Sequence, residues 1–129
     1  MRWVVSVKGV VRDGSRVLLA KNDRGEWELP GGQLEDGEQP DRCVVREVAE
    51  ESGLTVEATG LVDTYSFEVV PGTTVLIITF RCRITGDPAA IRVSSEHREV
   101  RFVELAELDQ LSLPEGYRSS IERDAARGN

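Results

Sequence analysis

The sequence has few of the features that define secreted, membrane or zinc-cysteine proteins. Cys43 and Cys82 are the 2 cysteines of the 129 residues; they lack Cys-x-x-Cys spacing and are too few for a disulfide framework. We expect free thiols, buried or half-buried. The longest apolar run, residues 75–80, is far shorter than the roughly 20 residues of a membrane helix, and the N-terminus has no signal-peptide pattern. The sequence therefore predicts a cytoplasmic protein without a membrane partner.

Basic residues are outnumbered by acidic ones. The chain has 16 Lys and Arg against 23 Asp and Glu, a net charge of −7, which opposes binding to a nucleic-acid duplex or an anionic membrane surface. An acidic protein can still bind a phosphorylated small molecule when divalent cations supply positive charge. The acidic clusters are therefore the place to look for function.

The length and composition are those of one globular domain. A chain of 129 residues can form one substantial core, and no repeat, linker or low-complexity tract divides it. We expect a single domain over residues 1–129, as a monomer or a homodimer.

Residue patterns predict a mixture of strands and helices. Strands 3–11 and 16–21 flank an Asp-Gly turn and form a hairpin, and a short extended piece at 27–30 leads into a glycine-rich loop at 31–37. A helix is expected from Pro40 to Ser52, with Gly53 as its stop. Further sheet is expected at 54–70, 73–84 and 99–103, and helical structure at 104–111 and 114–126. The order predicts an α/β or α+β fold, a mixed sheet covered by helices.

The predicted helix carries a cluster of carboxylates. At about 100° per residue, Glu47, Glu50 and Glu51 fall in one sector of the helix, opposite Val45, Val48 and Ala49, which we expect to face the core. Like charges this close repel one another, and a hard divalent cation would compensate them. Mg²⁺ prefers carboxylate and phosphate oxygens, and Mn²⁺ is a plausible substitute.

Two adjacent glycines precede this helix. Gly31 and Gly32 can adopt backbone angles that other residues cannot, so they can bring a carbonyl or amide close to a metal–phosphate centre.

Residues 32–54 follow a fixed pattern of glycine, acidic, basic and apolar positions. The specified residues are Gly32, Glu38, Arg46, Glu47, Val48, Glu50, Glu51, Gly53 and Leu54, with Leu29, Pro30 and Gly31 as the lead-in. This pattern resembles the Nudix box at each of its defined positions.

The resemblance implies a fold and a chemistry. The fold would be a Nudix-type α/β/α sandwich with a mixed sheet, and the activity would be metal-dependent cleavage of a phosphoanhydride bond in a nucleoside diphosphate linked to another group. Glu47, Glu50, Glu51 and the Gly32 carbonyl would be metal ligands, and Arg46 would pair with glutamates such as Glu38. The substrate would be a small nucleotide, attacked at phosphorus by water.

The general base is left open by the sequence. The resembled family often takes it from a later loop, and in the acidic loop 94–99 the candidates are Glu96 and Glu99. His97 could also act, but a lone histidine on a polar loop is more often solvated.

Aromatic side chains have two readings. Trp27, before the Pro-Gly-Gly segment, could stack on a base or close the core, and core closure is the favoured reading. Tyr65 and Phe67 carry the same ambiguity.

The substrate is not defined by the box. The extra motifs of the coenzyme A and NADH branches are absent, and Pro71 lies close to the position of a proline typical of the ADP-ribose branch. Nucleoside triphosphates, including oxidised ones, and ADP-ribose-like compounds stay equal options. A non-catalytic nucleotide-sensing domain and a structural acidic adaptor are alternatives of other classes, and the intact glutamates speak against the sensor.

Overall fold

The computed structural model describes residues 2–93, 97 and 99–128. Its elements in chain order are β1 (Arg2–Asp13), β2 (Arg16–Lys21), β3 (Trp27–Glu28), β4 (Gly31–Gln33), α1 (Pro40–Ser52), β5 (Val56–Val70), β6 (Thr73–Ile84), a 3₁₀ helix (Pro88–Ala90), β7 (Glu99–Glu104), a second 3₁₀ helix (Leu105–Gln110) and α2 (Glu115–Ala126). The predicted mixed α and β fold is confirmed.

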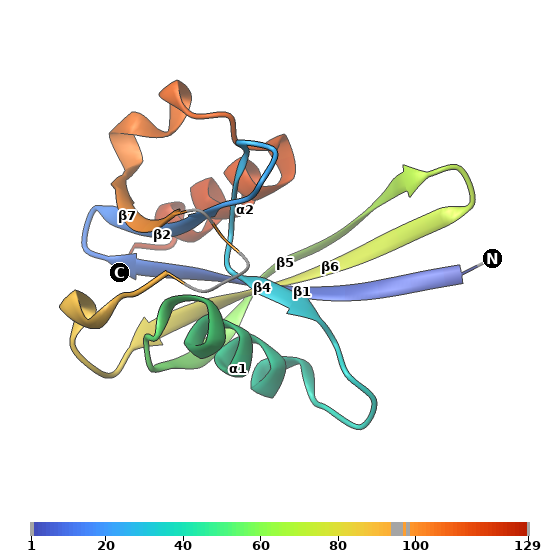
Figure 1. Cartoon of the computed structure of the whole chain (residues 1–129), viewed down its shortest axis with the longest axis horizontal. Helices are drawn as coiled ribbons and strands as arrows, with labels where there is room; N and C mark the ends of the chain where they lie inside the picture. The colour runs from blue at the N-terminus through green and yellow to red at the C-terminus, as the bar shows by residue number, and fades with distance from the viewer. Residues whose placement is uncertain (1, 94–96, 98, 129) are drawn as a thin grey trace.

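The strands form one mixed sheet of 7 strands built around β1. Its order is β3-β2-β1-β6-β5, with β4 also paired to β1 and β7 to β2. β1 runs parallel to β6, and the other pairings are antiparallel. The predicted β1–β2 hairpin exists only near its turn, where Arg12 pairs with Val17 and Asp13 with Arg16. The rest of β1 crosses to β6 and β4, and it runs beside β5 and β6 in Figure 1.

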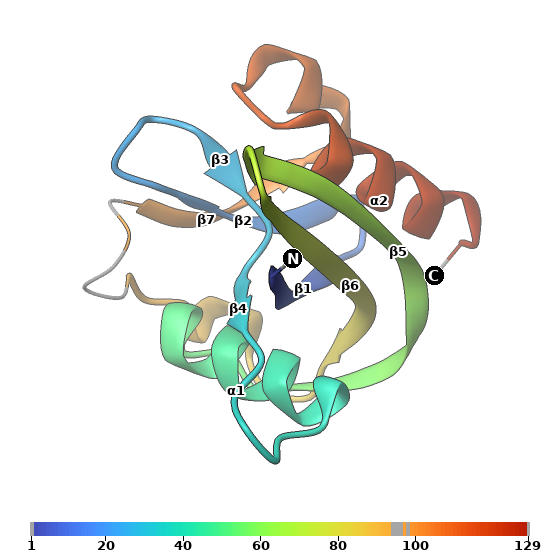
Figure 2. The same ribbon diagram turned by 90° about the vertical axis from the view of Figure 1, so that its right-hand side faces the viewer.

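Alternating side chains divide the core into two layers. On β2, Leu18 and Ala20 belong to the cluster that contains Val44 and Val48 of α1, whereas Val17 and Leu19 belong to the cluster that contains Ile121 of α2. The two helices therefore cover opposite faces of the strands, as Figures 1 and 2 show. This is the predicted α/β/α arrangement.

α1 begins and ends where its local signals predict. Pro40 is in its first turn, and Gly53 at its C-terminus has a φ of 77°. The predicted division of its faces is partly wrong, because Glu51 is 3 % exposed and lies on the buried side with Val48. Val45 and Ala49 are only half-buried.

Two other local predictions also need correction. Residues 31–33 of the expected glycine loop form strand β4, whose partner β1 supplies backbone hydrogen bonds that the local sequence does not reveal. The expected helix at 104–111 is a 3₁₀ helix. Cys43 and Cys82 are free and buried, as predicted. Within the described part of the chain, no helix is long and apolar enough to cross a membrane.

Candidate functional site

The Gly31-Gly32 pair lies between β1 and α1 without room for side chains. A Cβ on Gly31 would lie 1.9 Å from the Val7 carbonyl oxygen, and one on Gly32 would lie 2.6 Å from the Glu47 carboxyl carbon. The Gly31 amide donates a hydrogen bond of 2.9 Å to Glu51 Oε2. The two glycines therefore bring β4 directly against the carboxylates of α1.

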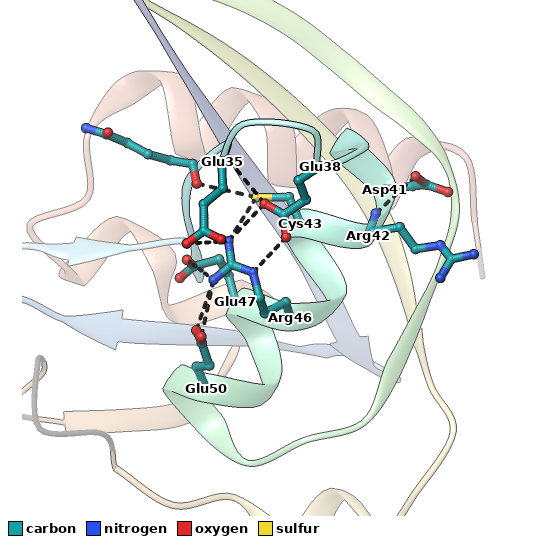
Figure 3. A network of polar contacts seen from close by, with 9 residues as sticks. Glu35, Glu38, Asp41, Arg42, Cys43, Arg46, Glu47 and Glu50 are labelled. Atoms are coloured by element: carbon teal, nitrogen blue, oxygen red, sulfur yellow. Dashed lines mark hydrogen bonds and ion pairs between the residues drawn. The ribbon is translucent and has the colours of Figure 1, made fainter.

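Arg46 holds several acidic side chains at the other end of this surface (Figure 3). Its Nε donates to Glu38 at 2.7 Å, and its Nη1 donates to Glu47 at 2.9 Å and to Glu50 at 3.0 Å. The hydrogen bond from Arg46 lowers the pKa of Glu38 to about 2. Arg46 thus ties the loop before α1 to the helix and orients Glu47 and Glu50.

Glu51 belongs to a second, more buried group. Its Oε1 lies 3.5 Å from His97 Nε2, which is 2.9 Å from Glu28 Oε2. Glu28, Glu51 and His97 each offer a ligand atom, and these atoms lie within 4.8 Å of one another. His97 has a side chain only 6 % exposed, so the expectation of a solvated histidine is wrong. Its position is fixed by contacts with β3 and α1, which its loop sequence does not indicate.

Burial and neighbouring charges set the pKa values here. Burial is the main cause that raises the pKa of Glu51 to about 8, while Lys8 and the Gly31 amide oppose this shift. Burial also acts to raise the pKa of Glu28, but the charge of Lys8 and hydrogen bonds from His97 and Asn22 lower it overall. Among the residues of the chain, burial therefore outweighs the positive charge of Lys8 and favours the protonated form of Glu51 at neutral pH.

This shift predicts a pH-dependent stability for the metal-free protein. Because its pKa is higher folded than unfolded, Glu51 binds a proton on folding between pH 4.5 and about 8, so its contribution is lost as pH rises through that window. In EDTA at pH 9, Glu51→Gln should raise the free energy of unfolding relative to wild type, by at most about 5 kcal/mol. At pH 4.5 the two proteins should be nearly equal.

Thermal melts at both pH values measure this difference. Glu122→Gln, which removes an exposed carboxylate from α2, is the matched control and should follow wild type at both pH values. A Glu51→Gln protein whose melting temperature tracked wild type from pH 4.5 to 9 would contradict the raised pKa.

A cavity of about 410 Å³ opens beside Glu28. Its lining is Asn22, Arg24, Glu26, Trp27, Glu28, Tyr65, Phe67, Pro114, Gly116 and Tyr117. Trp27 is 4 % exposed, lines the cavity and also belongs to the α2-side core. Its position is therefore compatible with stacking on a base and with closing the core. Phe67 is 45 % exposed, so it does not close the core. The cavity provides aromatic surface of the kind on which a base can stack.

The predicted site residues divide among several environments. Glu47 and Glu50 contact Arg46, whereas Glu51 faces Gly31, Glu28 and His97, so different partners hold the helix carboxylates. Glu99 pairs with Arg101 at 3.2 Å, with 45 % of its side chain exposed. Glu96 lies outside the described residues.

The sequence does not indicate Glu28 or Tyr117, and Lys8, which could reach a phosphate, is left out of the predicted site because most surface cations bind nothing specific. Lys8 is 8 % exposed on β1, and a lysine among the β-branched residues of a strand was the one available signal. Glu28 and Tyr117 have no comparable signal, because the fold alone brings β3 and α2 to this site.

Comparisons with known proteins identify the family. The family model of the NUDIX domain matches residues 2–123. The chain therefore belongs to the Nudix hydrolase family, as the residues of its box predicted.

The chain is similar to a MutT-like protein and to proteins named as a diphosphatase and a pyrophosphatase. A MutT-like protein of Streptomyces ambofaciens is 41 % identical over 101 residues, which are 77 % of this chain and 62 % of that protein. The putative 8-oxo-dGTP diphosphatase 2 of Mycobacterium tuberculosis is 32 % identical over 109 residues, 81 % of this chain and 75 % of that one. The crystal structure of an ADP-ribose pyrophosphatase from Streptococcus suis has a TM-score of 0.74 and 26 % identity, covering 98 % of this chain and 93 % of that chain.

Proposed function

We propose that this protein is a magnesium-dependent hydrolase that cleaves a phosphoanhydride bond in a nucleoside diphosphate linked to another group. The observation that carries the proposal is the position of two Nudix-box carboxylates, Glu47 and Glu51, against the Gly31-Gly32 strand, with Glu50 held by the same arginine as Glu47. The family membership and the names of the relatives support the same reaction.

The donor set fits a hard divalent cation. Glu47, Glu50 and Glu51 would supply carboxylate oxygens, and the carbonyl of Gly32, whose backbone packs against the Glu47 carboxylate, is the further proposed ligand. Oxygen ligands of this kind suit Mg²⁺ or Mn²⁺. The raised pKa of Glu51 also fits, because a nearby cation would favour its ionised form. These residues would hold the ion.

Bound magnesium supplies positive charge to the pyrophosphate oxygens and makes water a stronger acid. The residues of the chain orient the carboxylates and accept a proton. Arg46 holds Glu47 and Glu50, and the Gly31 amide holds Glu51, so the carboxylates are oriented before substrate binds. The attacking water forms a bond to phosphorus while the bridging oxygen leaves with its electron pair, and a carboxylate takes the water's proton. Glu96 and Glu99 are the proposed candidates for this base.

The aromatic cavity supports a nucleotide substrate. Tyr65, Phe67 and Tyr117 line a space next to Glu28, so a base stacked there would direct its phosphates toward Glu51 and α1. The products would be a nucleoside monophosphate and pyrophosphate from a triphosphate, or two monophosphates from an ADP-ribose-like compound. One relative is named for 8-oxo-dGTP and one structural neighbour for ADP-ribose, so the proposal includes both nucleoside triphosphates and ADP-ribose-like compounds as substrates.

A substrate panel tests the proposed function. Nucleoside triphosphates, oxidised triphosphates, ADP-ribose, NADH, sugar nucleotides and dinucleoside polyphosphates are incubated with and without magnesium, and the products are separated by chromatography. We expect magnesium-dependent turnover of one class. No turnover from folded protein that still binds magnesium would support a nucleotide-sensing domain instead.

A further inference from the structure

Lys8 is a buried cation on β1, close to a residue that lines the aromatic cavity. It is 8 % exposed, and its Nζ donates one hydrogen bond of 3.2 Å to the Leu29 carbonyl. The same Nζ lies 5.4 Å from the centroid of the Tyr117 ring. A buried lysine is uncommon without a paired anion, so its position calls for a function.

The hydrogen-bonding capacity of Lys8 is largely unused. An ammonium has three N–H donors, and among the described residues the Leu29 carbonyl is the acceptor that takes a hydrogen bond from it. The charge of Lys8 acts to lower the pKa of Glu28 and of Glu51, yet neither carboxylate forms an ion pair with it within the described structure. Its register partner on β6, Thr79, is fully buried, and its hydroxyl has no partner among the described atoms. Unmet capacity of this kind in a buried group indicates a missing ligand.

Lys8 also joins the two halves of the proposed site. Tyr117 and Glu28 line the aromatic cavity, and Glu51 belongs to the carboxylates of α1. A nucleotide with its base in the cavity and its pyrophosphate at the α1 carboxylates must therefore pass Lys8. In that arrangement the group nearest Lys8 would be the phosphate attached to the nucleoside.

We propose that Lys8 is a substrate-binding residue that donates hydrogen bonds to the phosphate nearest the nucleoside. This inference rests on the proposed function. Lys8 lies outside the Nudix box, and in this role it would add a positive charge from the chain itself to a site that otherwise depends on metal ions.

A thermodynamic cycle isolates this contact without metal or catalysis. Calorimetry in EDTA measures the binding of guanosine and adenosine, and of GMP and AMP, to wild type and Lys8→Met. Wild type should bind at least one monophosphate about 10- to 100-fold more tightly than its nucleoside, the size of a charged hydrogen bond. This preference should fall to less than about threefold in Lys8→Met and be partly restored in Lys8→Arg.

Lys21→Met is the matched control. Lys21 is the other lysine of the chain and also lies near an aromatic ring, 5.6 Å from the centroid of Trp27. The Lys21→Met variant should prefer the monophosphate over its nucleoside as strongly as wild type does. A preference that survives in Lys8→Met, or a wild type that binds nucleoside and monophosphate equally, would overturn the inference.

Mn²⁺ binding distinguishes a phosphate contact from general damage. Loss of a positive charge near Glu28 and Glu51 should tighten Mn²⁺ binding by Lys8→Met about 3- to 10-fold in the absence of nucleotide. Weaker binding of both Mn²⁺ and monophosphate would mean that Lys8 has only a structural role. If Lys8→Met does not fold, Lys8→Gln takes its place in the same cycle.

The outcome for Lys8 is separable from that of the proposed function. Wild type that hydrolyses nothing in the substrate panel but shows the Lys8-dependent preference in EDTA contradicts the hydrolase proposal and supports the phosphate contact. Turnover of one substrate with no such preference contradicts the role of Lys8 alone.

Discussion

Glu51→Gln is expected to lower kcat/KM for the hydrolysed substrate by at least about 10³. The substitution keeps the shape of the side chain but removes the charge that the proposed metal site requires. Glu51 is buried, and its Oε2 accepts a hydrogen bond from the Gly31 amide, so no other carboxylate can easily take its place. Steady-state kinetics over a range of magnesium concentrations measure the loss.

Two comparisons make this result specific. Glu122→Gln should retain the wild-type rate, because its carboxylate is exposed on α2. Glu51→Gln should also be at least as stable as wild type in EDTA at neutral pH, since the buried carboxylate no longer has to ionise. Lost activity can then not be attributed to unfolding. Activity within tenfold of wild type would show that Glu51 does not hold a catalytic metal.

Gly31→Ala is expected to destabilise the fold by at least about 3 kcal/mol. The added Cβ would lie 1.9 Å from a backbone oxygen, which cannot move as a side chain can. Strands β1 and β4 would have to separate, and the pairs Val7–Gly32 and Lys8–Gly31 would be lost. Thermal or urea unfolding measures the effect.

Two other glycines act as contrasts. Gly60 lies in β5 with nothing within 4 Å of an added Cβ, so Gly60→Ala should change stability by less than about 1 kcal/mol. Gly32→Ala would displace the Glu47 carboxylate, a movable side chain, so activity should fall more than stability. Equal stability of Gly31→Ala and Gly60→Ala would contradict the close β1–β4 approach.

Local sequence signals predict some elements and not others. α1 is predicted from Pro40 to Ser52 because both of its ends carry their own signals. β4 is not, because Gly31 and Gly32 have no strand propensity and become a strand only by pairing with β1. Exposure within α1 is likewise set by the tertiary fold, which buries Glu51.

In the candidate site, too, some residues are predicted by local sequence and others are brought together only by the tertiary fold. The box residues lie within one short segment, so their resemblance to the Nudix box predicts a metal-dependent hydrolase. Lys8, Glu28 and Tyr117 come from three separate segments, and only the sheet and α2 bring them together. His97 was expected in solvent because its contacts with Glu28 and Glu51 are tertiary. The proposed substrate-binding residues are therefore harder to predict from the sequence than the proposed metal ligands.

The most direct test of the central claim is hydrolysis in water enriched in ¹⁸O, followed by mass spectrometry of the products. Wild-type protein is supplied with nucleoside triphosphates and ADP-ribose, with magnesium or with EDTA. The account predicts a magnesium-dependent phosphate product that carries ¹⁸O, formed by water attack at phosphorus, and no such product from Glu51→Gln. Labelled product at equal rates in EDTA and in magnesium, or from Glu51→Gln, would contradict it.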